Sequence, residues 1–153
     1  MLSRRLFLSV ATFATLLPSG VFADDHVLTA SDANTGMLDG SLILIDVRRP
    51  EEWVETGVAE GAWLLDMTDE NFGAYVAAIL DRNPNHDVAV ICRTGNRTGR
   101  LMSAFAKAGM TGIKDVSEGM VGGPRGTGWI KTGLPLQDAH TAYDAMPKDL
   151  TAR

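Results

Sequence analysis

The sequence predicts an α/β fold, in which a small parallel β-sheet of four to five strands is covered by helices on both faces. Short, unbroken apolar runs of strand length recur along the chain, and such runs are typical of strands buried on both faces. Between them lie segments in which apolar residues recur at helical spacing. Because parallel neighbours need crossover connections, this alternation favours a parallel sheet.

The first half of the chain supplies two predicted strands and three predicted helices. Thr29 and Ser31 are capping candidates for a short helix within residues 27–40, which Gly40 closes. The other elements are a buried strand at Leu42–Ile45 that ends at Asp46, a short helix that starts at Pro50, a strand at Ala62–Leu65, and a helix that Asp69 caps and that runs to about Asp81.

The second half supplies two more strands and one long helix. In order, we expect a strand at Val88–Ile91, a helix from about Thr98 to a cap at Gly109, a strand at Ile113–Val116 beside the preceding one, a glycine-rich connection at 119–128, and a single helical turn at 129–133. Beyond Pro135 the chain is polar and lacks a strong period. Residues 137–153 are therefore expected to be a C-terminal tail with little independent stability.

Composition narrows the class of protein. The chain has 153 residues and no internal repeat, which is room for one domain with a real core. Hydrophobic residues make up 45% and charged residues 22%, as in ordinary soluble globular proteins. A formal net charge of −5 argues against binding nucleic acid or anionic lipid through net charge. One cysteine and three scattered histidines offer no ligand spacing, so we expect no metal and no cofactor.

The N-terminal residues 1–23 are predicted to be a signal peptide. Arg4 and Arg5 form a positive region, residues 6–17 an apolar stretch, and residues 21–23 a small-x-small cleavage site. A membrane anchor is the alternative, but the apolar stretch is shorter than the ~20 residues that span a bilayer. The segment around the two arginines also resembles a twin-arginine signal, so the general (Sec) and twin-arginine routes both stay open. We expect a periplasmic or secreted monomer that is not attached to the membrane.

Cys92, the only cysteine, stands directly after a predicted strand. Ligands of parallel sheets bind beyond the carboxyl ends of the strands, so the fold class places Cys92 at the functional edge. In an oxidising compartment a lone thiol forms no internal disulfide and needs its own explanation. The simplest alternative is a buried cysteine that serves as a small apolar filler.

The loop after Cys92 leads into a predicted helix and contains Gly95 between two arginines, Arg93 and Arg97. Backbone N–H groups in such a loop can form an anion-binding nest, and the helix N-terminus adds unpaired donors and a positive dipole end. This environment favours the thiolate, which is the nucleophilic form of cysteine. No separate base is then required, and the histidines at positions 26, 86 and 140 lie away from the loop in sequence.

The run Cys92-Arg93-Thr94-Gly95-Asn96-Arg97 resembles the active-site loop of the rhodanese family. The resemblance continues in Leu44–Arg48, Pro50–Trp53, Glu60–Ala62 and Gly133–Pro135, so it implies a rhodanese-like domain over residues 24–136. Two segments depart from the family pattern. Residues 57–62 lack the usual histidine, and residues 118–129 are longer and richer in glycine than usual, which suits a lid or a partner surface.

The resemblance implies a sulfurtransferase. Cys92 would take a sulfane sulfur from thiosulfate or a persulfide donor, hold it as a persulfide, and pass it to cyanide or a thiol acceptor. The expected partners are a small anionic sulfur donor and, as a candidate acceptor of the sulfur, a protein. Asp46 and Arg48 are expected to brace the loop through charge-assisted hydrogen bonds. The expected substrate-binding residues are Arg93 and Arg97 through their side chains, Thr94, Gly95 and Asn96 mainly through their backbone, and Thr98.

Two other functions compete with this one. A thiol of this kind also suits a non-enzymatic sulfur carrier or a redox sensor that acts with a partner protein. Protein-phosphatase loops place their arginine six positions after the cysteine, which here is Thr98, whereas this chain has Arg97 five positions after it. The shorter ring favours sulfur transfer over phosphate chemistry, because nest geometry depends on ring length.

Overall fold

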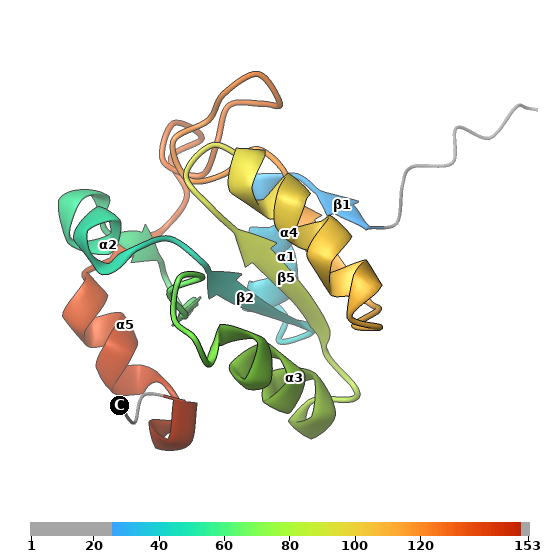
Figure 1. Ribbon diagram of the computed structural model, residues 1–153. Helices are drawn as coiled ribbons and strands as arrows, with labels where there is room; N and C mark the ends of the chain where they lie inside the picture. Colours follow the sequence, from blue (N-terminus) through green and yellow to red (C-terminus); the bar gives the residue numbers. More distant parts are fainter. Residues whose placement is uncertain (1–25, 151–153) are drawn as a thin grey trace, which may run out of the picture.

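The computed structural model describes residues 26–150 and contains a five-stranded sheet in which every pairing is parallel (Figure 1). Its strand order is β1-β6-β5-β2-β4, and a separate antiparallel pair joins β3 to β7. The predicted fold class is therefore confirmed. The strands are β1 (Val27–Leu28), β2 (Leu42–Asp46), β3 (Val58–Ala59), β4 (Trp63–Leu64), β5 (Asp87–Ile91), β6 (Ile113–Val116) and β7 (Leu136–Gln137).

The helices are α1 (Ala30–Leu38), α2 (Pro50–Thr56), α3 (Phe72–Arg82), α4 (Asn96–Lys107) and α5 (Ala139–Ala145), followed by the 3₁₀ turn η1 (Lys148–Leu150). Local signals explain where several of them begin and end. Thr29 caps α1, since its hydroxyl accepts from the backbone N–H of Asp32 at 3.0 Å. Gly109 follows α4 with a positive φ, as a C-terminal cap requires. Within residues 26–150, no helix is long and apolar enough to cross a membrane.

Three boundaries differ from the sequence expectation. Val27 lies in β1, which pairs with the edge of β6; because Thr29 is the helix cap, the chain before it is extended. Asp69 does not cap α3: its carboxylate accepts from the N–H of Asn71, which itself precedes the helix. Helix α4 starts at Asn96 rather than near Thr98, because Gly95 adopts a left-handed conformation and turns the chain sooner.

The sheet is buried on both faces, which places two apolar layers around β2 and β5. Alternate residues such as Leu44 and Ile91 face a cluster that includes Ala33 of α1 and the buried Trp129. The residues between them, such as Ile45 and Val90, face a larger cluster that includes side chains of α3, α4 and α5. Figure 1 shows α3 and α4 in front of the sheet and α1 behind it. Both faces are apolar, so the strands read as continuous apolar runs.

The C-terminal segment differs most from the expectation of a polar tail. From residue 137 to 150 it supplies the end of β7, the helix α5 and the turn η1. Ala142, Met146 and Leu150 are all buried in the larger core cluster. Their spacing of four residues is a helical signal. It is hard to recognise in the sequence, because polar residues lie between them and because Pro147 interrupts the pattern. The expectation for residues 151–153, like the signal peptide at 1–23, lies outside the described residues.

Replacing Ala142 by glutamate tests how far α5 belongs to the core. Ala142 is 1% exposed, so a glutamate there has to bury a charge or force α5 off the domain. We expect Ala142→Glu to lower the free energy of unfolding by about 3 kcal/mol or more, and Ala145→Glu, at an exposed position of the same helix, by less than about 0.5 kcal/mol. Urea unfolding of both variants measures the difference. Equal, small losses would contradict the assignment of α5 to the core.

Candidate active site

Cys92 lies immediately after the carboxyl end of β5, at the sheet edge that the sequence predicted. Its Sγ lies 3.6 Å from the Oγ1 of Thr98, which belongs to the first turn of α4. The chain between these two residues therefore closes into a ring, and we call residues 92–98 the cysteine loop. Gly95, with φ of 80°, makes the turn that allows this closure.

The backbone N–H groups of the cysteine loop are largely unpaired. Among the described residues, the N–H groups of Arg93, Thr94 and Gly95 find no hydrogen-bond acceptor. The next three N–H groups, at 96–98, belong to the first turn of α4, where a helix has no acceptors of its own. Together with the positive end of the α4 dipole, this run of donors favours negative charge in the loop.

The glycine-rich segment braces the cysteine loop from behind. The N–H of Met120 donates to the carbonyl oxygen of Cys92 at 2.8 Å, and that of Val121 to Arg93 at 2.9 Å. At Gly119 a Cβ would lie 2.6 Å from the carbonyl oxygen of Arg93, so backbone approaches backbone directly. Gly119 is needed for this contact, whereas Gly122 and Gly128 allow backbones to approach within the segment itself.

Asp46 and Arg48 form a fully buried ion pair that holds helix α2. Arg48 Nη2 donates to Asp46 Oδ2 at 2.7 Å and to the carbonyl oxygen of Gly57 at 2.8 Å. The guanidinium also reaches Glu52 O and Thr56 Oγ1, near the end of the same helix. Across residues 26–150, neither side chain makes a hydrogen bond to the cysteine loop. The expected loop bracing by this pair is therefore wrong: it fixes α2, because the strand end leaves both groups beside that helix.

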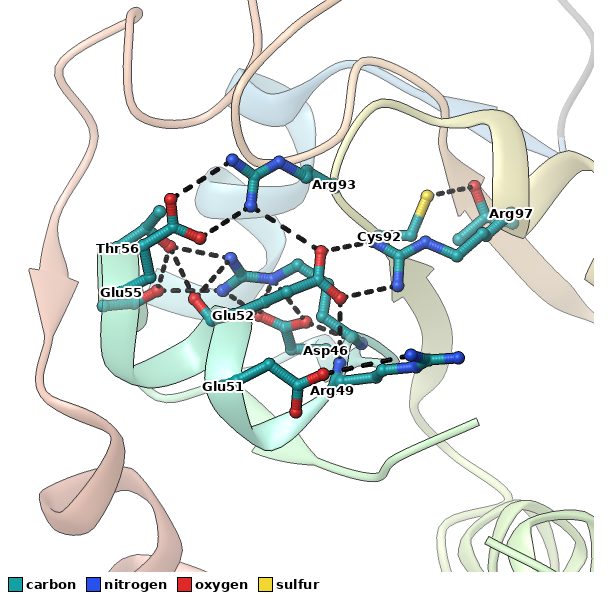
Figure 2. A network of polar contacts seen from close by, with 12 residues as sticks. Asp46, Arg49, Glu51, Glu52, Glu55, Thr56, Cys92, Arg93 and Arg97 are labelled. Atoms are coloured by element: carbon teal, nitrogen blue, oxygen red, sulfur yellow. Dashed lines mark hydrogen bonds and ion pairs between the residues drawn. The ribbon is translucent and has the colours of Figure 1, made fainter. Parts of the chain in front are cut away.

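The two arginines of the loop are held by carboxylates of α2 (Figure 2). Arg97 donates to both carboxylate oxygens of Glu52, at 2.5 and 2.7 Å. Arg93 Nη1 lies 3.0 Å from Glu55 Oε2 and 3.8 Å from Glu52 Oε1. The hydrogen bonds from Arg97 lower the pKa of Glu52 to about 2. The same bonds raise the pKa of Arg97, and the charge of Cys92 contributes in the same direction.

Glu52 and Glu55 were missed as site residues in the sequence. In the sequence, Glu51 and Glu52 are acids of the kind that stabilises the first turn of a helix, and α2 does begin there. That role explained both residues without a functional site. The available signal was the position of Glu52 in the segment that resembles the rhodanese family. Its contact with Arg97 joins residues far apart in the chain, and no local pattern predicts that contact.

The thiol itself is enclosed. Cys92 has 0% exposure and belongs to the larger core cluster, while its sulfur faces the hydroxyl of Thr98. A cavity of about 320 Å³ lies next to Arg97, and it is lined by Arg49, Glu51, Glu52, Met67, Thr68 and Arg97. A reagent can reach the sulfur only after side chains around it move. Arg97 is the residue of the cysteine loop that borders this cavity.

Asp115 on β6 is a further buried acid, and it lies near Thr98. It is 4% exposed, and its Oδ2 accepts from Arg125 of the glycine-rich segment at 3.3 Å. Burial raises the pKa of Asp115, against a smaller opposite effect of Thr98 and Arg125. No sequence pattern singled out this residue. Among the residues that the structure describes, no three His, Cys, Asp or Glu side chains are grouped to hold a metal ion.

Comparisons with known proteins agree with this architecture. A family model for the rhodanese-like domain matches residues 29–123. The uncharacterized protein RP600 of Rickettsia prowazekii is 26% identical over 118 residues, which cover 73% of this chain and 96% of that protein. The crystal structure of Rv0390 from M. tuberculosis has 28% sequence identity and a TM-score of 0.54, over 74% of this chain and 97% of that one.

A second similar structure is that of a protein of unknown function from Rhodopseudomonas palustris, described as a possible tyrosine phosphatase. It has a TM-score of 0.53 over 79% of this chain and 99% of that one. Its sequence identity is 16%, so the likeness shows the fold alone.

Proposed function

Because this chain belongs to the rhodanese-like domain family, we propose that it is a sulfurtransferase that carries a sulfane sulfur on Cys92 as a persulfide. The observation that carries the proposal is the closed cysteine loop. Cys92 Sγ and Thr98 Oγ1 lie 3.6 Å apart, with a run of unpaired N–H groups between them. Such donors stabilise a terminal sulfur anion, and their geometry is set before the reaction begins.

The proposed reaction has two steps. The thiolate of Cys92 attacks the outer sulfur of thiosulfate, a new S–S bond forms, and the bond to the sulfonate breaks with release of sulfite. With a persulfide donor, the same attack releases the donor's thiolate. In the second step, cyanide or a thiolate attacks the terminal sulfur of the Cys92 persulfide, which gives thiocyanate or a new persulfide and returns Cys92 to its thiolate form.

A non-enzymatic sulfur carrier or redox sensor is the second candidate, and one observation favours it. Cys92 is fully buried, and both loop arginines are paired with carboxylates rather than free to hold a small anion. A partner protein that opens the site would then control sulfur transfer. Phosphatase chemistry is disfavoured, because the arginine stands five positions after the cysteine and the ring is one residue too short.

Intact-mass measurement tests the proposal. We expect the wild-type domain to gain one sulfur atom on exposure to thiosulfate or a small-molecule persulfide, and to lose it on addition of cyanide with formation of thiocyanate. Cys92→Ser should gain none. A stable adduct that neither cyanide nor small thiols remove would favour the carrier, and the absence of any adduct from every donor would refute the sulfurtransferase.

We also propose that the protein acts outside the cytoplasm, which rests only on the predicted signal peptide at residues 1–23. Cell fractionation with an antibody against the domain, combined with the N-terminal sequence of the mature form, tests this. A mature form that begins after Ala23 in the periplasm or medium is expected. Replacing both Arg4 and Arg5 by lysine then distinguishes the export routes, because only the twin-arginine route should fail.

A further inference from the structure

Glu52 is the carboxylate that holds both arginines of the cysteine loop in place. Its side chain is 13% exposed, and it accepts two hydrogen bonds from Arg97 and one, at 3.1 Å, from the backbone N–H of Arg49. Arg93 lies within 3.8 Å of the same carboxylate. Glu52 therefore occupies the position beside the loop arginines that the anionic group of a small donor would otherwise take.

The cavity next to Glu52 carries charges of both signs. Arg49 and Arg97 line it together with Glu51 and Glu52, and Met67 and Thr68 complete the wall. An inorganic dianion that approaches Arg97 from this cavity meets two carboxylates and has to displace one of them. A molecule with both an ammonium and a carboxylate group finds a partner for each, so it can enter without leaving a charge unpaired.

Resting on the proposed sulfurtransferase function, we propose that Glu52 is a specificity-determining residue that selects amino-acid-type sulfur donors, which carry an ammonium as well as a carboxylate, over inorganic dianions such as thiosulfate. In the reaction, the Cys92 thiolate attacks the terminal sulfur of the donor persulfide. The S–S bond of the donor breaks, its thiolate leaves, and the sulfur remains on Cys92 as a persulfide anion. The donor's ammonium pairs with Glu52 and its carboxylate with an arginine of the cavity.

The test compares three donors that differ in one feature at a time. Cysteine persulfide carries an ammonium and a carboxylate, the persulfide of 3-mercaptopropionate lacks only the ammonium, and thiosulfate is a simple dianion. The measured quantity is the second-order rate of sulfur loading on Cys92, followed by intact mass. We expect the wild type to load from cysteine persulfide about tenfold faster than from either of the other two donors.

Three variants locate the selectivity. Glu52→Gln, which keeps an oxygen acceptor for the Arg49 N–H, should load faster from thiosulfate by about tenfold and lose the preference for the ammonium-bearing donor. Glu52→Asp, which keeps the charge, should retain the preference. Glu70→Gln, an exposed position with the same change in net charge, should behave as wild type.

The outcomes separate this proposal from the one on which it rests. Suppose that Cys92 is loaded in both wild type and Glu52→Gln, and that the ratios of the loading rates from the three donors are the same in both. This result would overturn the role of Glu52 and leave the proposed sulfurtransferase function intact. A wild type that prefers thiosulfate would do the same. Failure of every donor to load wild type would refute the sulfurtransferase function and this proposal with it.

Discussion

Gly95→Ala is expected to abolish sulfur loading on Cys92 and to lower the free energy of unfolding by more than about 3 kcal/mol. Gly95 has φ of 80°, which L side chains rarely adopt, and a Cβ there would overlap the carbonyl oxygen of Ser117. The oxygen belongs to the backbone and the position of a Cβ is fixed by the backbone, so neither atom can rotate away. The overlap has to be relieved by moving the cysteine loop away from the segment that braces it, which also disrupts the run of N–H donors around the sulfur.

Gly109→Ala is the matched control for this prediction. Gly109 has φ of 74°, but no atom lies within 4 Å of the position that a Cβ would occupy. Gly109→Ala should therefore lower the free energy of unfolding only by the backbone strain, about 1–2 kcal/mol, and leave sulfur loading unchanged. Urea unfolding gives the two stabilities and intact mass the two extents of loading. Equal losses for the two variants would show that the close approach to Ser117 does not matter.

Arg48→Met is expected to lower the free energy of unfolding by about 3–5 kcal/mol, because it leaves the Asp46 carboxylate buried without its partner. The substitution keeps much of the side-chain volume, so packing contributes little of the loss. It also removes the donors to the carbonyl oxygens of Glu52 and Gly57, which fix helix α2. Loosening of α2 should in turn weaken the pair between Glu52 and Arg97, and so change the rate of sulfur loading.

The double variant Asp46→Asn with Arg48→Met separates the two contributions. Removing the carboxylate charge as well should recover a large part of the lost stability, since no unpaired charge then remains buried. The lost hydrogen bonds to α2 are not recovered, so the altered loading rate should persist. Urea unfolding and loading rates measured on the single and double variants give the coupling between the pair. A double variant no more stable than Arg48→Met would contradict the importance of the unpaired charge.

Much of the fold could be predicted because its signals are local. The strands at 42–46 and 88–91 are runs long and apolar enough to be recognised without their neighbours, and Cys92 follows the second of them directly. Thr29, Pro50 and Gly109 mark helix ends through backbone chemistry that acts within one turn. The loop that resembles the rhodanese family was correctly placed between a strand and a helix for the same reason.

The features that could not be predicted depend on contacts between distant segments. Met146 packs in the core against strands that precede it by many residues, and a short helix with few apolar residues gives little sign of this. The pairing of Glu52 with Arg97 arises only once α2 and α4 are placed over the same end of the sheet. Likewise, the glycines near position 119 indicated flexibility, whereas their use is to let two backbones touch.

The strand order of the sheet has a consequence for how the chain reaches this structure. Strand β1 pairs with β6, so Val27 lies beside Asp115 although most of the domain separates them in sequence. Such distant partners must lose a great deal of chain entropy before their contact contributes anything, and proteins rich in such pairings fold slowly. The central strands β2 and β5 pair over five residues, so their pairing contributes more stabilising contacts early in folding. The edge strand β1 then joins late, as the last closure of a long loop.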